Sequence, residues 1–337
     1  HALGLKIIID LVANHTSWDS KILRQHPDWF TKDSTGAIVS PVPDWSDVAD
    51  LDYSKPALRE YMIRMLEYWV RDVGIDGFRC DVAEMVPTDF WNEARAALDR
   101  IKPVFMLSEG QYPEHHLKAF DATYGWPLYH LLGLMTAGEK GPRDLDTLLI
   151  AEVKNFPKQS IRMRFSSNHD ENAWDNPDVV KFGVNGAKMA AVLVSTFPGI
   201  PLLYNGQEAG SPVKLSLFEK VPIDWNAHPE FREFYTRLFE VRKTHPALSA
   251  TGAMTRLEGT DSTHVYSFMR TQGNDRVVVV INLSPSAYST RFMVPGAKRQ
   301  ALRLTPLVSA PGLQTAISGR EASVSLPGLG YAIYRVE

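Results

Sequence analysis

Three acidic residues each stand at the end of a short apolar run that is typical of a β-strand. The acids are Asp81, Glu109 and Asp170, and the runs that lead to them cover residues 75–80, 103–108 and 161–169. Because carboxylates are costly to bury, acids at the tips of buried strands indicate a function. The carboxyl ends of parallel strands meet at one face, so we expect the three carboxylates to share one site.

Strand-like runs alternate with helical patterns over most of the chain. We expect strands near residues 6–12, 78–81, 103–108, 120–124, 161–168 and 200–204. Residues from 56 to 73 show helical periodicity, with one apolar face formed by Leu58, Tyr61, Met62, Met65, Leu66 and Trp69. Further helices are expected at 88–101, between 125 and 155, at 185–196 and at 231–244. This βαβ alternation predicts an α/β fold, specifically a (β/α)8 TIM barrel.

The pattern changes after Pro246. Strand-like runs separated by Gly, Asn and Pro turns follow one another without helical periodicity. We therefore expect a catalytic barrel over residues 1–245, with an inserted loop region at about 16–55, and an antiparallel β-sandwich domain over 246–337.

Composition excludes several classes of protein. The formal net charge is −3 and no basic run occurs, so nucleic acid is not an expected partner. No apolar stretch approaches the roughly 20 residues of a membrane span, so no membrane interaction is expected. The single cysteine, Cys80, lies inside a predicted strand and is expected to be a small buried apolar side chain.

The residues around two of the acids suggest distinct chemical roles. Arg79 and Asp81 alternate onto the same face of their strand, where the guanidinium favours an ionised carboxylate that suits a nucleophile. Glu109 follows an almost wholly apolar strand, and such a setting favours the protonated form that suits a general acid. The alternative for Asp81 is a structural ion pair with Arg79, and the alternative for Glu109 is a carboxylate that caps the following helix.

Two clusters of polar residues mark other strand ends. Residues 168–170 read Asn-His-Asp, and Asp10, Asn14 and His15 follow the first strand. Such residues could bind a metal, or stabilise a turn. Four tryptophans near these loops could stack on a ligand or pack in the core: Trp18, Trp45, Trp126 and Trp174.

Considered together, these segments resemble the signature regions of the α-amylase family of glycoside hydrolases. The segments are 10–15 (DLVANH), 77–81 (GFRCD), 107–109 (LSE) and 165–170 (FSSNHD), with 50–52 (DLD) as a shorter match. They occur in the family's order and at compatible spacing. The resemblance extends over essentially the whole chain, including the β domain.

The resemblance implies a role for each matching residue. Asp81 matches the catalytic nucleophile, Glu109 the general acid/base, and Asp170 a third carboxylate that stabilises the transition state. Three residues match positions that bind the glucose unit at the cleaved bond: His15, Arg79 and His169. The implied activity is retaining hydrolysis of α-1,4-glucosidic bonds in starch, maltodextrin or related α-glucans, through a covalent glycosyl-enzyme intermediate.

The resemblance also concerns cofactors and specificity. Asn14 and Asp50 match positions that hold a structural Ca²⁺ in many members, while the chemistry itself requires no cofactor. Most α-amylases carry Lys-His where this chain has Glu84 and Met85. We therefore expect Glu84 to contact the leaving side of the glucan. The run 81–83 is similar to the neopullulanase and maltogenic branch.

Several alternatives remain open at this stage. The nearest are a transglycosidase and an α-glucosidase of the same family. A non-catalytic carbohydrate-binding homologue would usually lose the acids that this chain keeps. A metal-dependent hydrolase would use His15, His169 and Asp170. The sequence makes no prediction of the oligomeric state.

The number of predicted strands is the last expectation. The family barrel has eight strands, and this chain begins at what corresponds to the third, with six strands recognisable. Because a barrel removes its sheet edges only by closing, we expect another segment or chain to supply the remaining strands.

Overall fold

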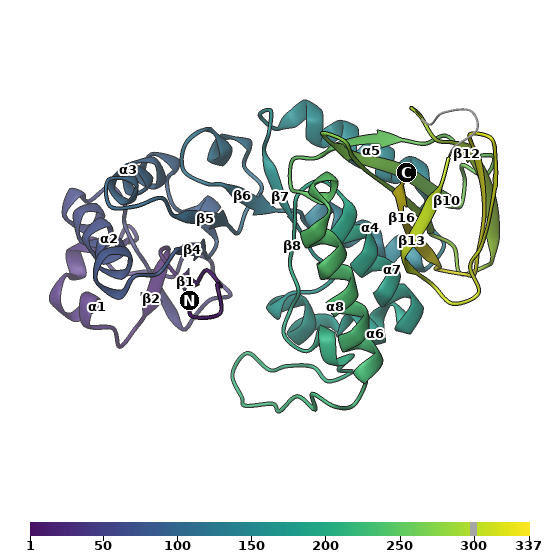
Figure 1. Cartoon of the computed structure of the whole chain (residues 1–337). Coiled ribbons are helices and arrows are strands. Elements are labelled where there is room, and N and C mark those ends of the chain that lie inside the picture. The colour runs from purple at the N-terminus through teal and green to yellow at the C-terminus, as the bar shows by residue number, and fades with distance from the viewer. Residues whose placement is uncertain (297–301) are drawn as a thin grey trace. The chain divides into compact units, whose positions relative to one another are not determined.

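The computed structural model describes residues 1–296 and 302–337, and the chain divides into two compact units (Figure 1). The first comprises residues 1–124 and 155–160, and the second comprises 125–154 and 161–337. This division differs from the expected domain boundary between residues 245 and 246. The expected boundary stays a prediction. Residues 297–301 of the predicted β domain lie outside the described residues.

The first unit is built on a parallel sheet. Its strands lie in the order β1 (Ile8–Leu11), β4 (Gly77–Cys80), β5 (Phe105–Ser108) and β6 (Ala122–Tyr124). Asp10 is paired with Arg79, and Arg79 with Leu107, so these residues lie level in the sheet. Gly77 has φ +155°, and a Cβ there would lie 1.8 Å from the Phe105 carbonyl oxygen, so β4 and β5 approach closely only because this residue is glycine.

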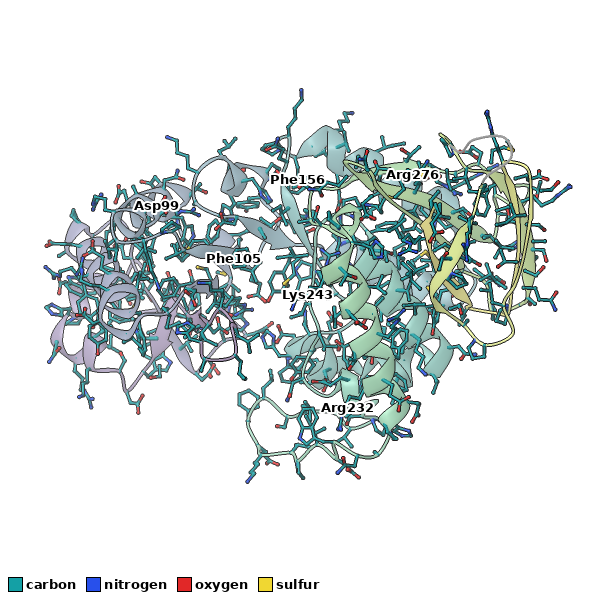
Figure 2. The ribbon with its side chains drawn as sticks, in the orientation of Figure 1. Asp99, Phe105, Phe156, Arg232, Lys243 and Arg276 are labelled. Carbon is teal, nitrogen blue, oxygen red and sulfur yellow. The ribbon has the colours of Figure 1, made fainter. Side chains whose placement is uncertain are left out.

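Two helices cover this sheet as the apolar periodicity predicts. In α2 (Pro56–Tyr68), Leu58, Met62 and Leu66 are buried. The helix α3 (Thr88–Asp99) buries Phe90, Trp91 and Leu98 in the same core, where Phe78 and the free Cys80 of β4 also lie. Asp99, near the end of α3, and Phe105, which opens β5, are labelled in Figure 2.

The inserted region contains more regular structure than expected. Short strands β2 (His15–Ser17) and β3 (Val48–Asp50) pair antiparallel, and α1 (Lys21–Gln25) lies between them in sequence. His15 lies opposite Asp50 in this ladder. Strands of three residues leave too little alternation for a sequence pattern to reveal, which is why the region was expected to be irregular.

The second unit begins with α4 (Trp126–Thr136) and α5 (Pro142–Asn155), followed by the parallel pair β7 (Ile161–Arg164) and β8 (Ile200–Pro201). Three more helices belong to it: α6 (Asp178–Lys181), α7 (Gly183–Thr196) and α8 (Pro229–Thr244). The strand expected at 200–204 is shorter in the structure because the Tyr204 N–H donates to Gln207 Oε1 instead of to a neighbouring strand. The short α6 was not predicted.

After α8 the chain forms two antiparallel sheets. The five-stranded sheet has the order β13 (Leu304–Ser309), β16 (Tyr331–Val336), β11 (Asp275–Asn282), β10 (Val265–Gln272) and β9 (Ala253–Arg256). The three-stranded sheet has the order β12 (Tyr288–Met293), β15 (Glu321–Leu326) and β14 (Gln314–Ser318). Side chains from both sheets form one core, including Val278, Tyr334, Phe292 and Val324. The predicted β-sandwich is thus present. Within the described residues, no helix is long and apolar enough to cross a lipid bilayer.

Candidate active site

The guanidinium of Arg79 is the centre of the polar cluster in the first unit. Arg79 lies on β4, and its side chain is 9 % exposed. Its Nη1 donates to Asp10 Oδ1 at 2.8 Å and to Asp81 Oδ1 at 2.8 Å. Its Nη2 lies 2.5 Å from Glu109 Oε1, and its Nε donates to the Tyr124 hydroxyl at 3.2 Å. One cation therefore holds side chains from β1, β6 and the residues that follow β4 and β5.

The charges of this cluster reinforce one another. Burial of the Arg79 guanidinium alone would lower its pKa, but Tyr124, Glu109 and Asp10 outweigh burial and raise it. Burial also raises the pKa of Tyr124 to about 12, so this hydroxyl is a neutral partner near neutral pH. Arg79 is thus a permanent positive charge beside Asp81 and Glu109.

The environment of Glu109 differs from the apolar setting that its strand predicted. Its Oε1 faces Arg79, and its Oε2 accepts the backbone N–H of Val82 at 2.9 Å. The prediction was wrong about the surroundings because β5 is apolar along its own length, while the groups that meet its final residue come from β4 and the turn after it. Sequence proximity does not reveal those neighbours.

The residues expected to hold calcium lie on adjacent chain segments. Asn14 is buried, its backbone carbonyl accepts the N–H of Leu51, and its Nδ2 lies 3.5 Å from His15 Nδ1. Burial raises the pKa of the Asp50 carboxyl, although a hydrogen bond from Thr31 and the charge of His15 act in the opposite direction. A partly buried carboxylate beside a buried amide is a donor set of the kind that Ca²⁺ prefers.

Glu84 lies four residues after the end of β4 and makes a specific contact of its own. It belongs to a short 3-10 turn, Ala83–Met85, and one oxygen of its half-buried carboxylate accepts the backbone N–H of Gln111. Whether it also contacts a bound glucan stays a prediction.

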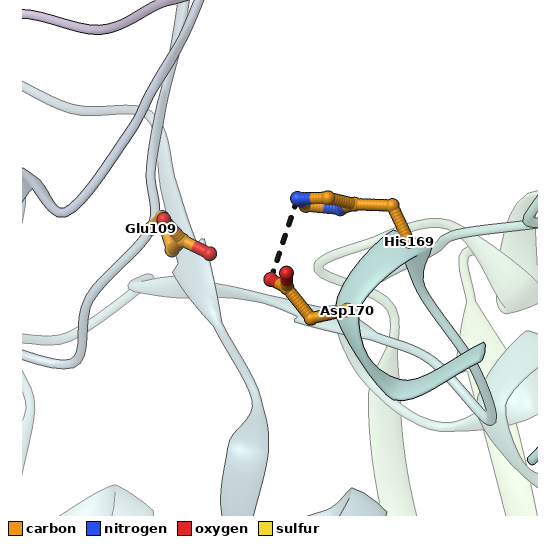
Figure 3. A group of neighbouring side chains, drawn as sticks. All are labelled: Glu109, His169 and Asp170. Carbon is orange, nitrogen blue, oxygen red and sulfur yellow. Dashed lines mark ion pairs between the residues drawn. The ribbon is translucent and has the colours of Figure 1, made fainter. Parts of the chain in front are cut away.

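The second unit carries the predicted Asn-His-Asp cluster in the turn that follows β7. His169 Nε2 lies 3.3 Å from Asp170 Oδ2, and both side chains are about one third exposed (Figure 3). Asn168 is buried, and its Oδ1 accepts the Glu171 N–H at 2.9 Å, which shapes the turn. Glu109, drawn in the same figure, belongs to the first unit.

The tryptophans divide between packing and exposure. Trp45 contacts the His15 ring edge-on at 5.4 Å, and Trp126 packs edge-on against Phe165 at 5.0 Å. Trp18 is partly exposed, and its Nε1 donates to the Ser46 carbonyl. Trp174 is 69 % exposed, and its ring centroid lies 6.4 Å from that of Phe218.

The roles of three residues in these clusters were not predicted from the sequence. Tyr124 is the last residue of a predicted strand, so its position at a strand end was the available signal. Asp10 was recognised as polar but not as the partner of Arg79. Phe218 lies in a segment without regular structure, and no pattern marked it.

The first unit thus carries paired carboxylates at the carboxyl edge of a parallel sheet, an arrangement typical of α/β proteins of the (β/α)-barrel class. The chain belongs to the α-amylase family, because residues 1–278 match the family model of the α-amylase catalytic domain. The comparisons agree with the expected fold, a barrel of this family followed by a β-rich domain.

Individual relatives are similar over much of the chain. A cyclomaltodextrinase of Geobacillus thermopakistaniensis is 25% identical over all of this chain and 60% of its own length. The α-amylase MalA of Haloarcula japonica is 29% identical over 84% of this chain and 43% of its own length. The chain therefore spans 60% or less of these two relatives. The maltogenic α-amylase AmyB of Thermotoga neapolitana is similar in structure, with a TM-score of 0.85 and 29% identity over all of this chain and 79% of that chain.

Proposed function

We propose that the protein is a retaining glycoside hydrolase that cleaves α-1,4-glucosidic bonds in starch, maltodextrin or related α-glucans. The observation that carries this proposal is the single guanidinium, Arg79, which contacts both Asp81 and Glu109. Two carboxyl groups joined by one cation are close together, and retaining enzymes require a separation of only about 5 Å. The printed names of the relatives, cyclomaltodextrinase and maltogenic α-amylase, support the same class of substrate.

The proposed reaction has two steps. An oxygen of Asp81 forms a bond to the anomeric carbon while the glycosidic bond breaks, and Glu109 gives its proton to the departing oxygen. Glu109 then removes a proton from water, the water oxygen bonds to the same carbon, and Asp81 leaves as a carboxylate. Two inversions give net retention. Arg79 supports the first step because its Nη1 donates to Asp81 Oδ1 and orients the attacking carboxylate.

The remaining roles are proposals that rest on the resemblance. Asp170 is assigned as the third carboxylate, and His15 and His169 as ligands of the glucose unit. A transglycosidase and an α-glucosidase of the same family remain the alternative activities. The name of the structural relative, a maltogenic α-amylase, is consistent with the similarity of the run 81–83 to the neopullulanase and maltogenic branch.

A structural Ca²⁺ is also proposed, with Asn14 and Asp50 as two of the six to eight oxygen ligands that the ion takes. The residues fit this ion because a buried amide and a partly buried carboxylate supply oxygen donors from adjacent chain segments. The test is thermal unfolding of the full-length protein with and without a chelator. Asp50→Asn should lose the chelator-sensitive part of the melting temperature, and a chelator without effect on the wild type would contradict the proposal.

The experiment that tests the activity is a time course on maltoheptaose. Proton NMR of the first products should show the α-anomer before mutarotation, because retention preserves configuration. Short maltooligosaccharides identify a hydrolase, while products longer than the substrate identify a transglycosidase. An initial β-anomer, or no turnover of any α-glucan, would contradict the proposed function.

A further inference from the structure

The turn after β4 has an unusual backbone conformation. Val82, which follows Asp81 directly, has φ 35° and ψ 46°, in the left-handed region. This region is unfavourable for an L-residue, and a β-branched side chain there is a genuine outlier. Strain of this kind persists only where the surroundings hold it, and it tends to occur at functional sites.

Hydrogen bonds from three consecutive residues hold this turn against the segment that follows β5. The N–H of Val82 donates to Glu109 Oε2 at 2.9 Å, and the N–H of Ala83 donates to the Glu109 carbonyl oxygen at 3.2 Å. In the opposite direction, the N–H of Gln111 donates to Glu84 Oε1. Val82 thus has its left-handed conformation in a turn whose N–H groups donate to Glu109.

The packing of Glu84 depends on the residue next to Glu109. A Cβ on Gly110 would lie 2.6 Å from Glu84 Cγ, which is closer than a Cβ approaches a neighbouring heavy atom in proteins. The φ of Gly110 is not positive, so the requirement for glycine here is one of space. The stem of Glu84 thus lies directly against the backbone that carries Glu109.

Both oxygens of Glu109 are consequently oriented. Oε1 is held by Arg79 and Oε2 by the Val82 N–H. A general acid must present its proton to the leaving oxygen in one direction, and a displacement of 1 Å can cost about 100-fold in rate. The orientation of the Val82 N–H therefore matters for the first step of the proposed reaction.

We propose that Glu84 is a positioning residue for Glu109. Its bond to Gln111 keeps the 82–84 turn docked on the 109–111 segment, so that the Val82 N–H stays aimed at Glu109 Oε2. This inference rests on the proposed glycosidase function and gives Glu84 a different role from contact with the leaving side of the glucan. It predicts that Glu84 affects the protonation step and leaves glucan binding unchanged.

The test uses two substrates that differ in their need for an acid. Maltoheptaose releases a sugar alkoxide that must be protonated, whereas a nitrophenyl α-maltoside releases a stable phenolate. Glu84→Ala in the full-length protein should lower kcat on maltoheptaose about 10- to 100-fold, with KM within about twofold, and should change the rate of the phenolate burst from the aryl maltoside less than about threefold. Glu84→Gln keeps an acceptor for the Gln111 N–H and should retain most of the activity. Glu60→Ala, on the exposed face of α2, is the matched control.

Other outcomes would overturn the inference. A raised KM or altered product lengths, with kcat unchanged, would make Glu84 a glucan ligand. If Glu84→Ala lowers kcat on maltoheptaose and the burst rate on the aryl maltoside by the same factor, or lowers neither, then Glu84 only stabilises the fold. Amide hydrogen exchange tests the contact without turnover: the Gln111 and Val82 amides should exchange faster in Glu84→Ala than in Glu60→Ala. Absence of wild-type activity would instead contradict the proposed function, and the exchange result would still decide whether Glu84 holds the turn.

Discussion

Arg79 Nη2 lies 2.5 Å from Glu109 Oε1, although Arg79 is on β4, Glu109 directly follows the neighbouring strand β5, and the two residues are thirty positions apart in sequence. The same guanidinium donates to Asp81. The proposed nucleophile and the proposed acid are therefore fixed relative to a common cation. Such a shared partner keeps the carboxylates at a defined spacing while the charge on Glu109 changes during the reaction.

Replacing the proposed nucleophile should stop the covalent step. Asp81→Asn should lower kcat on maltoheptaose on the order of 10⁴-fold or more, because an amide oxygen is a poor nucleophile. The volume is almost unchanged and the amide can still accept from Arg79, so the unfolding midpoint should move little. A variant that unfolds, or one that keeps appreciable turnover, would argue against this role. Kinetics and urea unfolding on the same preparation provide the check.

Replacing the proposed acid should depend on the leaving group. Glu109→Gln should lower kcat on maltoheptaose by about 10²–10⁴-fold, which is the usual contribution of a general acid. The first step with an activated aryl maltoside needs no proton, so formation of the covalent intermediate should be largely preserved. A burst of phenolate in rapid-mixing experiments would show this. If the phenolate burst slows by the same factor as turnover of maltoheptaose, Glu109 is not the acid.

A buried histidine that contacts β5 should make the free energy of unfolding depend on pH. His115 is fully buried, Ser108 Oγ lies 2.9 Å from its Nδ1, and burial lowers its pKa to about 4. Its pKa in the unfolded chain is about 6.5, so the unfolded state binds the proton first as pH falls. The free energy of unfolding should thus decrease between about pH 6.5 and pH 4, by about 3 kcal/mol in total from this residue.

Urea unfolding at several pH values measures this effect. His115→Asn should flatten the acid limb of the stability profile, because the asparagine has no charge to gain. His228→Asn is the matched control, since this side chain is about half exposed and should leave the limb unchanged. Identical acid limbs in the wild type and His115→Asn would contradict the prediction.

A buried arginine should be essential for the stability of the second unit. Arg270, on β10, donates to the backbone carbonyls of Thr196, Ser249 and Gly252, and it is fully buried. Burial lowers the pKa of its guanidinium to about 10, with Arg242 and Arg164 acting in the same direction, so it remains charged near neutral pH. Arg270→Met would leave three buried carbonyls without this donor. The unfolding free energy should fall by about 3 kcal/mol or more.

Arg291→Met on β12 is the control for this change, because Arg291 is exposed and its loss should cost less than about 0.5 kcal/mol. Thermal or urea unfolding of both variants gives the comparison. Equal stabilities would show that the carbonyls find other donors.

The sequence by itself determined the elements and the chemistry available at their ends. Helical periodicity located α2 with its buried face, and apolar runs located β4 and β5 with the acids that follow them. These features are local, because a strand or helix imposes its own period on consecutive residues. The order of the motifs also predicted the family, which the comparisons confirm.

Only the tertiary structure decided which residues meet. Arg79 joins Asp10, Asp81, Glu109 and Tyr124 because the register of neighbouring strands brings their carboxyl ends level. The left-handed Val82 and the contact of Glu84 with Gln111 depend on the same alignment. Partners far apart in sequence leave no periodic signal, and their contacts exist only once the sheet has paired in one register. For this reason Glu109 was expected in an apolar environment, and the structure places it beside a cation.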